Sequence, residues 1–370
     1  MKFQINSSTL KNILGLLAKI PYSNSNPIKS AFFIQVEENK LTVYVSDEVI
    51  AIEKTIQNTE IQVEKPGKII VNAYILNELI QKLDGLIKLQ TTDDKTLNLE
   101  SEHSKARLNL LDSEHWKDIQ KHQNGQEITL STNNLKQIQN QVAFAAQGRE
   151  GRVVFQGVNL RVVDKKLIAT ATDGSRIARK LLSATDYDLD IILPLRTVLE
   201  TNRIVSESKA KTLKAQITED QIVFMIDENT TLTSYLIHET FPDTEPQLVR
   251  VASAKVVCET RKILEAIERT SIVFDKQSLP RTILKIQNKT LCVSSPEENE
   301  VGHFQEQLIP LEITGSEQSI SLQSKFLLSV LRTIDDDKVI LEFTAEEGPL
   351  KIQAESHSSL IHLLMPFWSY

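Results

Sequence analysis

Alternation of apolar and polar residues occurs three times along the chain, each time as two short runs joined by a polar turn. The paired runs are 32–36 with 40–45, 158–162 with 166–169, and 282–286 with 289–293, with turns at 37–39, 164–165 and 287–288. A period of two is typical of a half-buried β-strand, so each pair predicts a β-hairpin. Leu41, Leu167 and Leu291 hold equivalent places in the three hairpins, 126 and then 124 positions apart. This regular step indicates an internal repeat.

Segments with helical periodicity keep the same step. Ahead of the hairpins, apolar residues recur every three or four positions at Leu10, Ile13, Leu14 and Leu17, at Leu135, Ile138 and Val142, and at Ile263, Leu264 and Ile267. The residues expected to cap these helices are Ser8 or Thr9, Asn133 or Asn134, and Thr260. Second helices are expected at 74–83, 197–205 and 326–333, and a closing hairpin within 86–110, 213–237 and 339–364.

The chain is therefore predicted to contain three tandem copies of one α+β domain, in which two helices pack on antiparallel sheets. The predicted domains are residues 1–125, 126–251 and 252–370, and the total length of 370 residues suits two or three domains. We expect the first and last strands of each copy at opposite edges, where tandem units can pair and close into a ring. Three α+β domains with a coincidental likeness are the alternative.

The composition is that of a globular protein, with 41% apolar and 25% charged residues. A net charge of −7 argues against a protein that coats nucleic acid with its whole surface, but it allows one basic face. Helix residues that do not face the sheets would line the opening of the ring, which would suit a DNA duplex, and the cations expected there are Lys11, Lys19, Lys82, Lys136, Arg149, Arg196, Arg203, Arg269 and Arg332. Carboxylates such as Glu78, Asp84 and Glu200 interrupt these helices, so a solvated face of mixed charge is the alternative.

Motifs for chemistry are absent from the sequence. It contains no GxxxxGK[ST], GxSxG, HExxH or GxGxxG, so no catalytic residue, metal or cofactor is expected. Cys258 and Cys292 are expected to be buried apolar residues, and His357 and His362 to lie on the surface on opposite faces of a terminal strand. The acidic runs 297–300 and 335–337 are expected to be solvated. The apolar run at 13–18 is too short for a signal peptide or a membrane span, so we expect a cytoplasmic protein.

Three short motifs make the interpretation more specific: ATATDGSRIA at 169–178, FPDT at 241–244, and LLMPF at 363–367. They are similar to the ATDGHRLA-type signature, the FPD or YPDT element and the apolar ending of the bacterial DNA sliding clamps, the β subunit of DNA polymerase III. The resemblance covers the whole chain, repeat by repeat. Ser175 stands where histidine is common in that family, and the last residues also differ, which suggests a divergent or second-copy member.

The resemblance implies a function without catalysis. A head-to-tail homodimer would form a six-domain ring around double-stranded DNA, independent of sequence, and would hold the replicative DNA polymerase, the clamp loader and repair proteins there. A monomeric peptide-binding scaffold with the clamp fold is one alternative, and an enzyme with an unrecognised site is another.

The family also implies which residues act. Its motif segments form a groove for a short peptide of partner proteins, and the matching positions, with two residues expected at the rim, are Arg152, Phe155, Thr172, Gly174, Ser175, Arg176, Ile177, Pro242, Gln323, Phe326, Leu363, Leu364, Met365, Pro366 and Phe367. At the implied dimer interface, Leu108 and Leu110 would meet Ile272 and Val273. Lys105 and Arg107 would face Glu297, Glu298 and Glu300. The alternative makes these leucines ordinary core residues.

Overall fold

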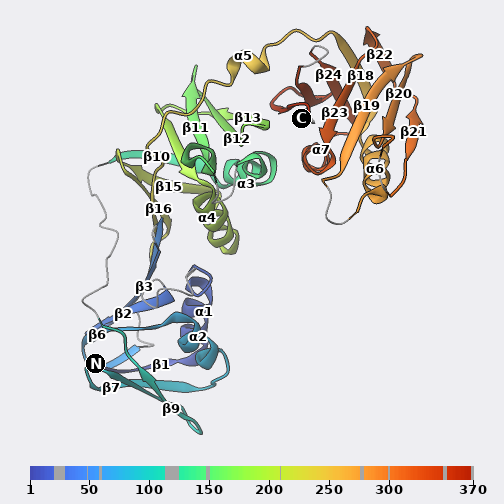
Figure 1. Ribbon diagram of the computed structural model, residues 1–370. Helices are drawn as coiled ribbons and strands as arrows, with labels where there is room; N and C mark the ends of the chain where they lie inside the picture. The colour runs from blue at the N-terminus through green and yellow to red at the C-terminus, as the bar shows by residue number, and fades with distance from the viewer. Residues whose placement is uncertain are drawn as a thin grey trace. The chain divides into compact units, whose positions relative to one another are not determined.

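The structure, a computed structural model, describes residues 1–20, 30–47, 49–57, 61–112, 125–146, 151–208, 210–275, 279–298, 301–344 and 348–367. The chain divides into two compact units (Figure 1). The first unit contains Met1–Thr132 and Leu199–Leu236, and the second contains Asn133–Val198 and Ile237–Tyr370. The predicted boundaries near residues 125 and 251 stay predictions, because the middle copy contributes to both units.

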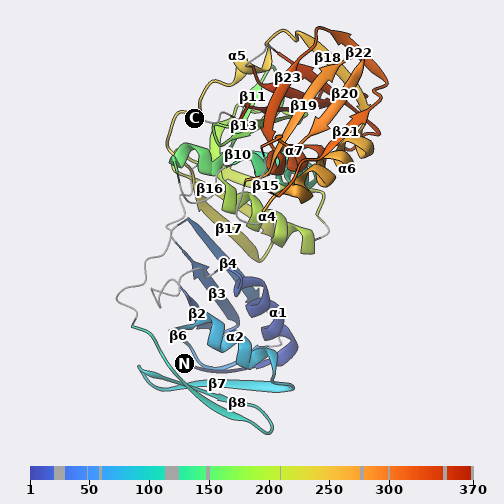
Figure 2. The same cartoon turned by 45° about the vertical axis from the view of Figure 1, so that its right-hand side comes forward.

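One order of elements occurs three times: a strand, a helix, a group of strands, a second helix and three closing strands. The first copy contains β1 (Lys2–Asn6), α1 (Ser7–Leu17), β2 (Ala31–Glu37), β3 (Lys40–Ser46), β4 (Ile50–Gln57), β5 (Ile61–Lys65), β6 (Gly67–Asn72), α2 (Ala73–Gln81), β7 (Leu86–Asp93), β8 (Thr96–Glu100) and β9 (Lys105–Asn109). Figure 2 shows α1 and α2 side by side on the strands of the first unit.

The second copy contains β10 (Gln126–Ser131), α3 (Thr132–Gln141), η3 (Ala143–Ala145), η4 (Val153–Gln156), β11 (Gly157–Val163), β12 (Lys166–Thr172), β13 (Arg176–Ala184), β14 (Asp190–Pro194), α4 (Leu195–Glu207), β15 (Thr212–Ile217), β16 (Gln221–Asp227), β17 (Thr230–Tyr235) and α5 (Glu245–Leu248). The third contains β18 (Ala254–Glu259), α6 (Thr260–Thr270), η5 (Ser271–Val273), β19 (Arg281–Gln287), β20 (Thr290–Ser294), β21 (Gln305–Leu308), β22 (Glu312–Gly315), β23 (Ser319–Gln323), α7 (Ser324–Leu331), β24 (Lys338–Phe343), β25 (Leu350–Ala354) and β26 (Leu360–Leu364). The predicted α+β class and threefold repeat are confirmed. Each closing segment has three strands, one more than the predicted hairpin.

The three predicted hairpins are present with the predicted leucines in equivalent register. Leu41 pairs with Val36, Leu167 with Val162, and Leu291 with Ile286. The prediction of the third turn was wrong by one residue: it is Asn288–Lys289, with φ values of 52° and 59°. Positive φ at both central residues is the two-residue turn that matches the twist of the flanking strands, so Gln287 stays in β19.

The first helices begin earlier than predicted. Asn6 caps α1, because its side-chain oxygen accepts a hydrogen bond from the backbone N–H of Ser8 at 2.9 Å. Ser8 and Thr9 therefore lie inside the first turn. In α6, Thr260 is the first helical residue and Glu259 holds the cap position. The predicted caps missed these starts because each helix directly follows a strand.

The described strands form four antiparallel sheets, two of which join neighbouring copies. In the first unit, the eight-stranded sheet runs β10-β15-β16-β17-β4-β3-β2-β6, and in the second the nine-stranded sheet runs β14-β11-β12-β13-β26-β25-β24-β18-β22. The remaining sheets run β5-β1-β7-β8-β9 and β21-β20-β19-β23. Each joint pairs the last strand of one copy with the third central strand of the preceding copy, as in β17 with β4 and β26 with β13.

The prediction that the first strand of each copy is an edge is wrong for the first and third copies, whereas β10 of the second copy does lie at the edge of its sheet. β1 lies between β5 and β7, and β18 lies between β22 and β24. β9 is the first-copy equivalent of β17 and β26, and β21 is the third-copy equivalent of β4 and β13. Unlike those strands, β9 and β21 lie at the edges of their sheets. Neither has a second strand partner among the described residues.

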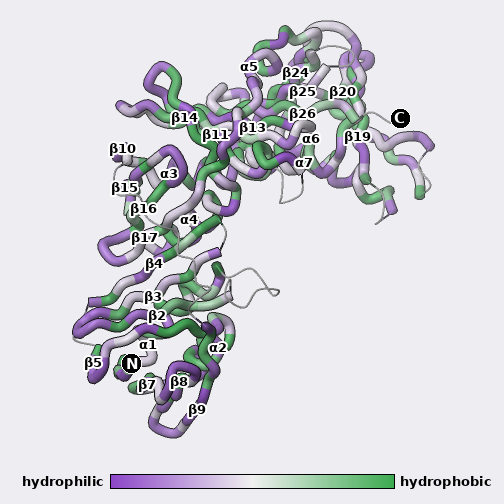
Figure 3. The backbone as a smooth tube through the Cα atoms, turned by 60° about the vertical axis from the view of Figure 1, so that its left-hand side comes forward, coloured by the Kyte–Doolittle hydropathy of each residue, from purple (hydrophilic) through white to green (hydrophobic). Residues whose placement is uncertain are grey.

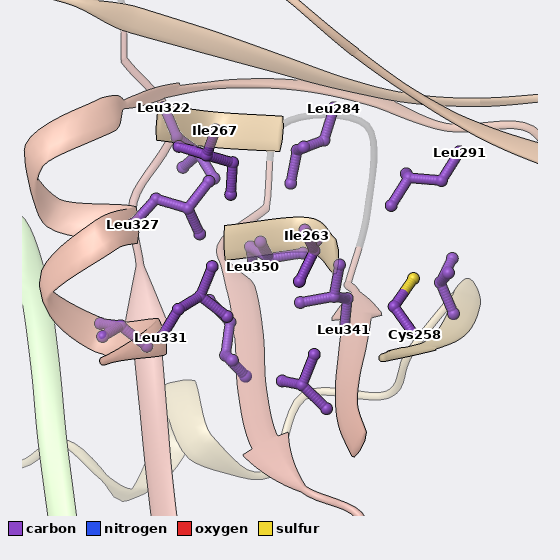
Figure 4. Packing of buried hydrophobic residues seen from close by; sticks show 14 of the residues in the cluster. Cys258, Ile263, Ile267, Leu284, Leu291, Leu322, Leu327, Leu331, Leu341 and Leu350 are labelled. Carbon is purple, nitrogen blue, oxygen red and sulfur yellow. The ribbon is translucent and has the colours of Figure 1, made fainter. Parts of the chain in front are cut away.

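Apolar side chains of helices and sheets form the core of the third copy (Figure 4). Ile263 and Ile267 of α6 and Leu327 and Leu331 of α7 point to the same cluster as strand residues such as Leu291. Figure 3 shows hydrophobic and hydrophilic residues alternating along the strands, as the period of two predicts. Burying one such leucine contributes roughly 1.5–3 kcal/mol.

The cysteine prediction is confirmed. Cys258 and Cys292 are buried free thiols, and Cys258 belongs to the core cluster of the third copy. Burial, with a smaller effect of the Glu259 charge, raises the pKa of Cys258 to about 12. Among the described residues, no helix is long and apolar enough to cross a membrane.

Candidate functional site

The turn between β12 and β13 is held by its own side chains. Asp173 Oδ1 accepts hydrogen bonds from the backbone N–H groups of Ser175 at 2.9 Å and Arg176 at 3.1 Å. Thr172 Oγ1 donates to the carbonyl of Arg176 at 2.7 Å and accepts from the N–H of Gly174 at 3.1 Å. Gly174 has φ +89°, a backbone conformation that residues other than glycine rarely adopt. The turn therefore fixes the start of β13.

Arg176 is fixed between an acid and two aromatic rings. Its Nε donates to Asp173 Oδ2 at 2.9 Å, and both side chains are largely buried. The guanidinium carbon lies 4.2 Å from the ring centre of Phe326 and 5.5 Å from that of Phe144. Burial lowers the pKa of Arg176, and the Asp173 carboxylate opposes that shift. The arginine is thus held in place before any ligand arrives.

The end of the chain lies beside this turn. Leu364 pairs with Arg176 and Leu363 with Ile177, and the N–H of Met365 donates to the carbonyl of Ser175 at 2.9 Å. Leu363 and Leu364 are each 1% exposed, whereas Met365 is 40% exposed. The two leucines therefore support the groove from within, and Met365 offers it an apolar surface.

Five further predicted groove residues lie around the same elements. The Arg152 guanidinium lies 5.3 Å from the ring of Phe155, and that ring is next to Gly174. Gln323, at the end of β23, pairs with Arg281. Pro366 and Phe367 continue from Met365, and the N–H of Phe367 donates to the carbonyl of Ser321 at 2.7 Å. The structure thus brings these residues together with the turn.

Pro242 is the predicted groove residue that the described contacts do not join to the others. It is exposed and precedes α5. Glu245 of α5 forms an ion pair with Arg179 of β13 at 3.0 Å. Pro242 therefore belongs to a segment fixed to the groove strand, without a described contact to Arg176 or Met365.

His362 contradicts the prediction of a surface residue, because it is fully buried in β26. The hydroxyl of Thr333 donates to the carbonyl of Val330 at 2.7 Å, so it accepts a hydrogen bond from His362 Nε2 at 2.8 Å. Nδ1 is then an acceptor with no described partner. Burial, and to a lesser degree the charge of Lys180, lowers the pKa of His362 to about 3. The imidazole is therefore neutral at physiological pH.

Sequence reasoning missed Phe144, Asp173 and Arg281. The ring of Phe144 contacts both the Arg176 guanidinium and, at 5.5 Å between ring centres, His362. It lies in η3, which is too short to give a periodic signal. Asp173 was within a recognised motif, and its place between a strand and a glycine was a signal for a turn.

Four of the predicted DNA-facing cations are already paired within the chain. Lys11 contacts Asp84 at 2.9 Å, Arg203 contacts Glu200 at 2.7 Å, Arg269 contacts Glu306 at 2.8 Å and Arg332 contacts Glu268 at 2.8 Å. Lys19, Lys82 and Lys136 are exposed, and Arg196 lies in the first turn of α4. Arg149 lies outside the described residues. The basic field on these helices is therefore weaker than the count of cations suggests.

The predicted interface residues lie in or near β9 in the first copy, and in η5 and the segment before β21 in the third. Lys105 and Arg107 are exposed on β9, and Leu108 and Leu110 are half-buried. Ile272 is 75% exposed and Val273 is half-buried in η5, while Glu298 is exposed before β21. Glu300 lies outside the described residues. Within one chain these two groups belong to different units.

Repeat-equivalent residues at the internal joints are better buried. Ala106, Leu232 and His362 are equivalent residues of the last strands in the three copies. Each is three strand pairings away from the equivalent residue of its copy's first strand, which is Phe3, Ile128 or Val256. Leu232 and His362 are fully buried, whereas Ala106 is half-buried. The edge strand β9 therefore lacks cover that both internal joints provide.

The same holds for β21. Ile52 pairs with Val45, and Ala178 pairs with Ala171. Val45 and Ala171 each lie four residues after the repeated leucine of their hairpin, Leu41 or Leu167. In the third copy this position is Ser295, whose N–H donates to the carbonyl of Phe304 at 2.9 Å. Ile52 and Ala178 are fully buried, but Phe304 is half-buried. Phe304 thus occupies the place of a buried joint residue on an uncovered edge.

Three tandem domains joined edge to edge, with the motif segments side by side at one joint and with β9 and β21 left as sheet edges among the described residues, define a protein of the DNA clamp class. Family models of the DNA polymerase III beta subunit match all three parts: the N-terminal domain at residues 1–120, the central domain at 129–243 and the C-terminal domain at 250–368. The chain belongs to the DNA polymerase III beta-subunit family.

Relatives and solved structures agree with this family. The chain is 24% identical to the beta sliding clamp of Bacillus subtilis, with 100% of each chain covered, and 26% identical to that of Mycoplasma capricolum, with 99% covered. The solved sliding clamp of Bacillus subtilis has a TM-score of 0.91 at 24% identity, and the beta subunit of Streptococcus pyogenes has 0.88 at 25%, each with 100% of both chains covered.

Proposed function

We propose that this chain is a DNA sliding clamp that closes as a head-to-tail homodimer around double-stranded DNA and gives the replicative DNA polymerase its processivity. The observation that carries the proposal is the pair of edge strands, β9 and β21. Each is the repeat equivalent of an edge that is joined inside the chain. Two copies can therefore form two more joints of the same kind and close a ring of six domains.

The internal joints supply a register for the joint between copies. Leu232 pairs with Ile52 at one joint and His362 with Ala178 at the other. The equivalent pair is Ala106 of one copy opposite Phe304 of its partner copy. In this register Leu108 would lie two residues further along β9 on the same face.

Apolar contact would supply most of the adhesion at this joint. Ile272 follows Phe144 by 128 positions and is its equivalent in the third copy, as η5 is of η3. The rings of Phe144 and Phe326 both contact the guanidinium of Arg176. Phe326 is the third residue of α7, and its equivalent in the first copy is Ile75, the third residue of α2. Ile272 would therefore meet Ile75 of the other copy, and both are exposed in the single chain.

Charge would orient the two copies. Lys105 and Arg107 are exposed on β9, and the acidic residues Glu298 and Glu300 lie on the segment before β21. Opposite charges at the rim of an interface steer association and fix its direction, and each exposed pair contributes roughly 0–1 kcal/mol. The head-to-tail direction follows from this asymmetry.

The ring would hold DNA by enclosure more than by affinity. Contacts from Lys82, Lys136 and their neighbours would be to phosphates, which makes them independent of sequence. Because four of the predicted cations are paired in the chain, few counterions would be released on binding. Weak contact of this kind suits sliding.

The groove would receive peptides from the polymerase, the clamp loader and repair proteins. An apolar side chain of the partner would contact Met365 and the ring of Phe326, and polar groups of the turn would fix the direction of the peptide. The chain itself would carry out no catalysis and need no cofactor. It would act in the cytoplasm, with an ATP-driven loader opening the ring.

Retention on DNA tests the proposed function. On nicked circular DNA with a loader and ATP, the protein is expected to stay bound through gel filtration, because a closed ring cannot leave a circle. Cutting the same DNA once should release it within the time of the column. Equal retention on circular and linear DNA would contradict enclosure, and the mixture without ATP serves as the control.

A further inference from the structure

Three arginines around the groove lie over phenylalanine rings. The pairs are Arg152 with Phe155 at 5.3 Å, Arg176 with Phe326 at 4.2 Å, and Arg281 with Phe367 at 5.1 Å, measured from the guanidinium carbon to the ring centre. The rings are partly buried; Arg152 is exposed and Arg281 half-buried, whereas the Arg176 side chain is largely buried. An aromatic face stabilises a cation and leaves the edge of the guanidinium available to a ligand.

The three arginines differ in their charge partners. Asp173 neutralises Arg176. No carboxylate among the described residues forms an ion pair with Arg152 or Arg281, which we call the rim arginines. The groove therefore has two positive charges that the described chain leaves uncompensated.

The rim arginines are connected to different parts of the groove. The Phe155 ring under Arg152 lies next to Gly174, in the turn whose Ser175 carbonyl binds the N–H of Met365. The Phe367 ring under Arg281 follows two residues after Met365 and is anchored to Ser321. Exposed Met365 lies between these two anchoring points along the groove.

We propose that the groove selects partner peptides that carry a carboxylate on each side of an apolar anchor. The inference rests on the proposed function of the groove and specifies its ligand. The anchor would contact Met365, one carboxylate would bind Arg152, and the other would bind Arg281. Guanidinium and carboxylate can form two parallel hydrogen bonds, so the match is one of geometry as well as charge.

Peptide binding to the full-length protein tests this inference. The probes are two fluorescein-labelled nonapeptides with the same apolar core of leucine and phenylalanine, one with Asp and one with Asn on both sides of the core. Fluorescence anisotropy at low salt is expected to give about tenfold tighter binding of the Asp peptide, as two rim contacts of modest strength predict. The preference should shrink at high salt because exposed charges are screened.

Substitutions assign the preference to the rim arginines. Arg281→Gln and Arg152→Gln should each reduce the ratio of the two affinities to about threefold, and the double substitution should remove it. Arg281→Lys keeps the charge but loses the planar fork, so it should restore the ratio only in part. Arg261→Gln is the matched control, because Arg261 is a highly exposed arginine of α6 outside the groove, and it should leave the ratio unchanged.

The outcomes separate this inference from the proposed function. Equal binding of the two peptides would overturn the inference while the groove remains a peptide site. A preference that survives the double substitution would also overturn it. If neither peptide binds, the groove is not the peptide site and the inference fails with it, whereas retention on circular DNA still tests enclosure separately.

Discussion

Replacing Ile272 by aspartate is expected to convert the dimer into monomers. At the proposed joint this side chain would be enclosed by apolar residues of the other copy, and a buried carboxylate without a partner is strongly unfavourable. We expect the dissociation constant of the dimer to rise at least about 100-fold, as for other central interface residues. Sedimentation velocity at micromolar concentration measures the change. The free energy of unfolding of each chain should change little, because Ile272 is 75% exposed in the single chain.

Val251→Asp is the matched control for this substitution. Val251 is 86% exposed and lies outside both edge strands, so its replacement should leave the dimer intact. A dimer that survives Ile272→Asp would contradict the proposed joint. Equal dissociation by both substitutions would show a general effect of charge and would contradict it as well.

Removing residues 366–370 is expected to abolish peptide binding while the dimer persists. The deletion takes away the Phe367 ring and the hydrogen bond from its N–H to the carbonyl of Ser321. Met365 would then be a free chain end beside the Ser175 turn. We expect the affinity for the Asp-flanked nonapeptide to fall at least about 100-fold, a loss of roughly 3 kcal/mol. Met365→Ala should have the same direction with a smaller effect.

Leu311→Ala provides the control for the groove. Leu311 is an exposed apolar residue of the third copy, and its N–H binds the carbonyl of Val257, far along the sheet from β13. Its replacement should not change peptide affinity. Unchanged affinity after the deletion would place the peptide site elsewhere on the chain, and sedimentation of the truncated protein checks that the dimer remains.

Local periodicity was sufficient to predict the repeated elements. The hairpins follow from a period of two and short polar turns, and Leu41, Leu167 and Leu291 kept their equivalent register. The error at Asn288–Lys289 has a local cause as well. Asn and Lys can both adopt positive φ in a two-residue turn, but the sequence favours neither of the two possible turn positions strongly.

The pairing between copies could not be read from local patterns. β26 has the sequence of a strand near a chain end, so His362 was assigned to the surface. Its burial results from pairing with β13, about 180 residues earlier in the sequence. For the same reason β1 and β18 were wrongly assigned to edges, since β5 and β22 are distant strands that pair with them.

Which residues lie together at the proposed groove was predictable where the residues are contiguous in sequence and less so where they are not. The segments from Thr172 to Ile177 and from Leu363 to Phe367 carry motifs, and the structure places them side by side. Arg281 has no motif of its own. It reaches the groove because the chain end crosses to β23, whose residue Gln323 pairs with Arg281.

Cross-linking between two copies tests the third joint most directly. In a chain carrying Ala106→Cys and Phe304→Cys, opposite positions of the proposed antiparallel pair would be close enough for a disulfide. Cys258 and Cys292 are buried, so they should not compete. Mild oxidation is expected to give a covalent dimer of twice 41.8 kDa on a denaturing gel. Arg107→Cys with Phe304→Cys, on opposite faces, should react far less. A chain that stays monomeric on the gel, or that forms a ladder of longer polymers, would contradict the closed head-to-tail dimer.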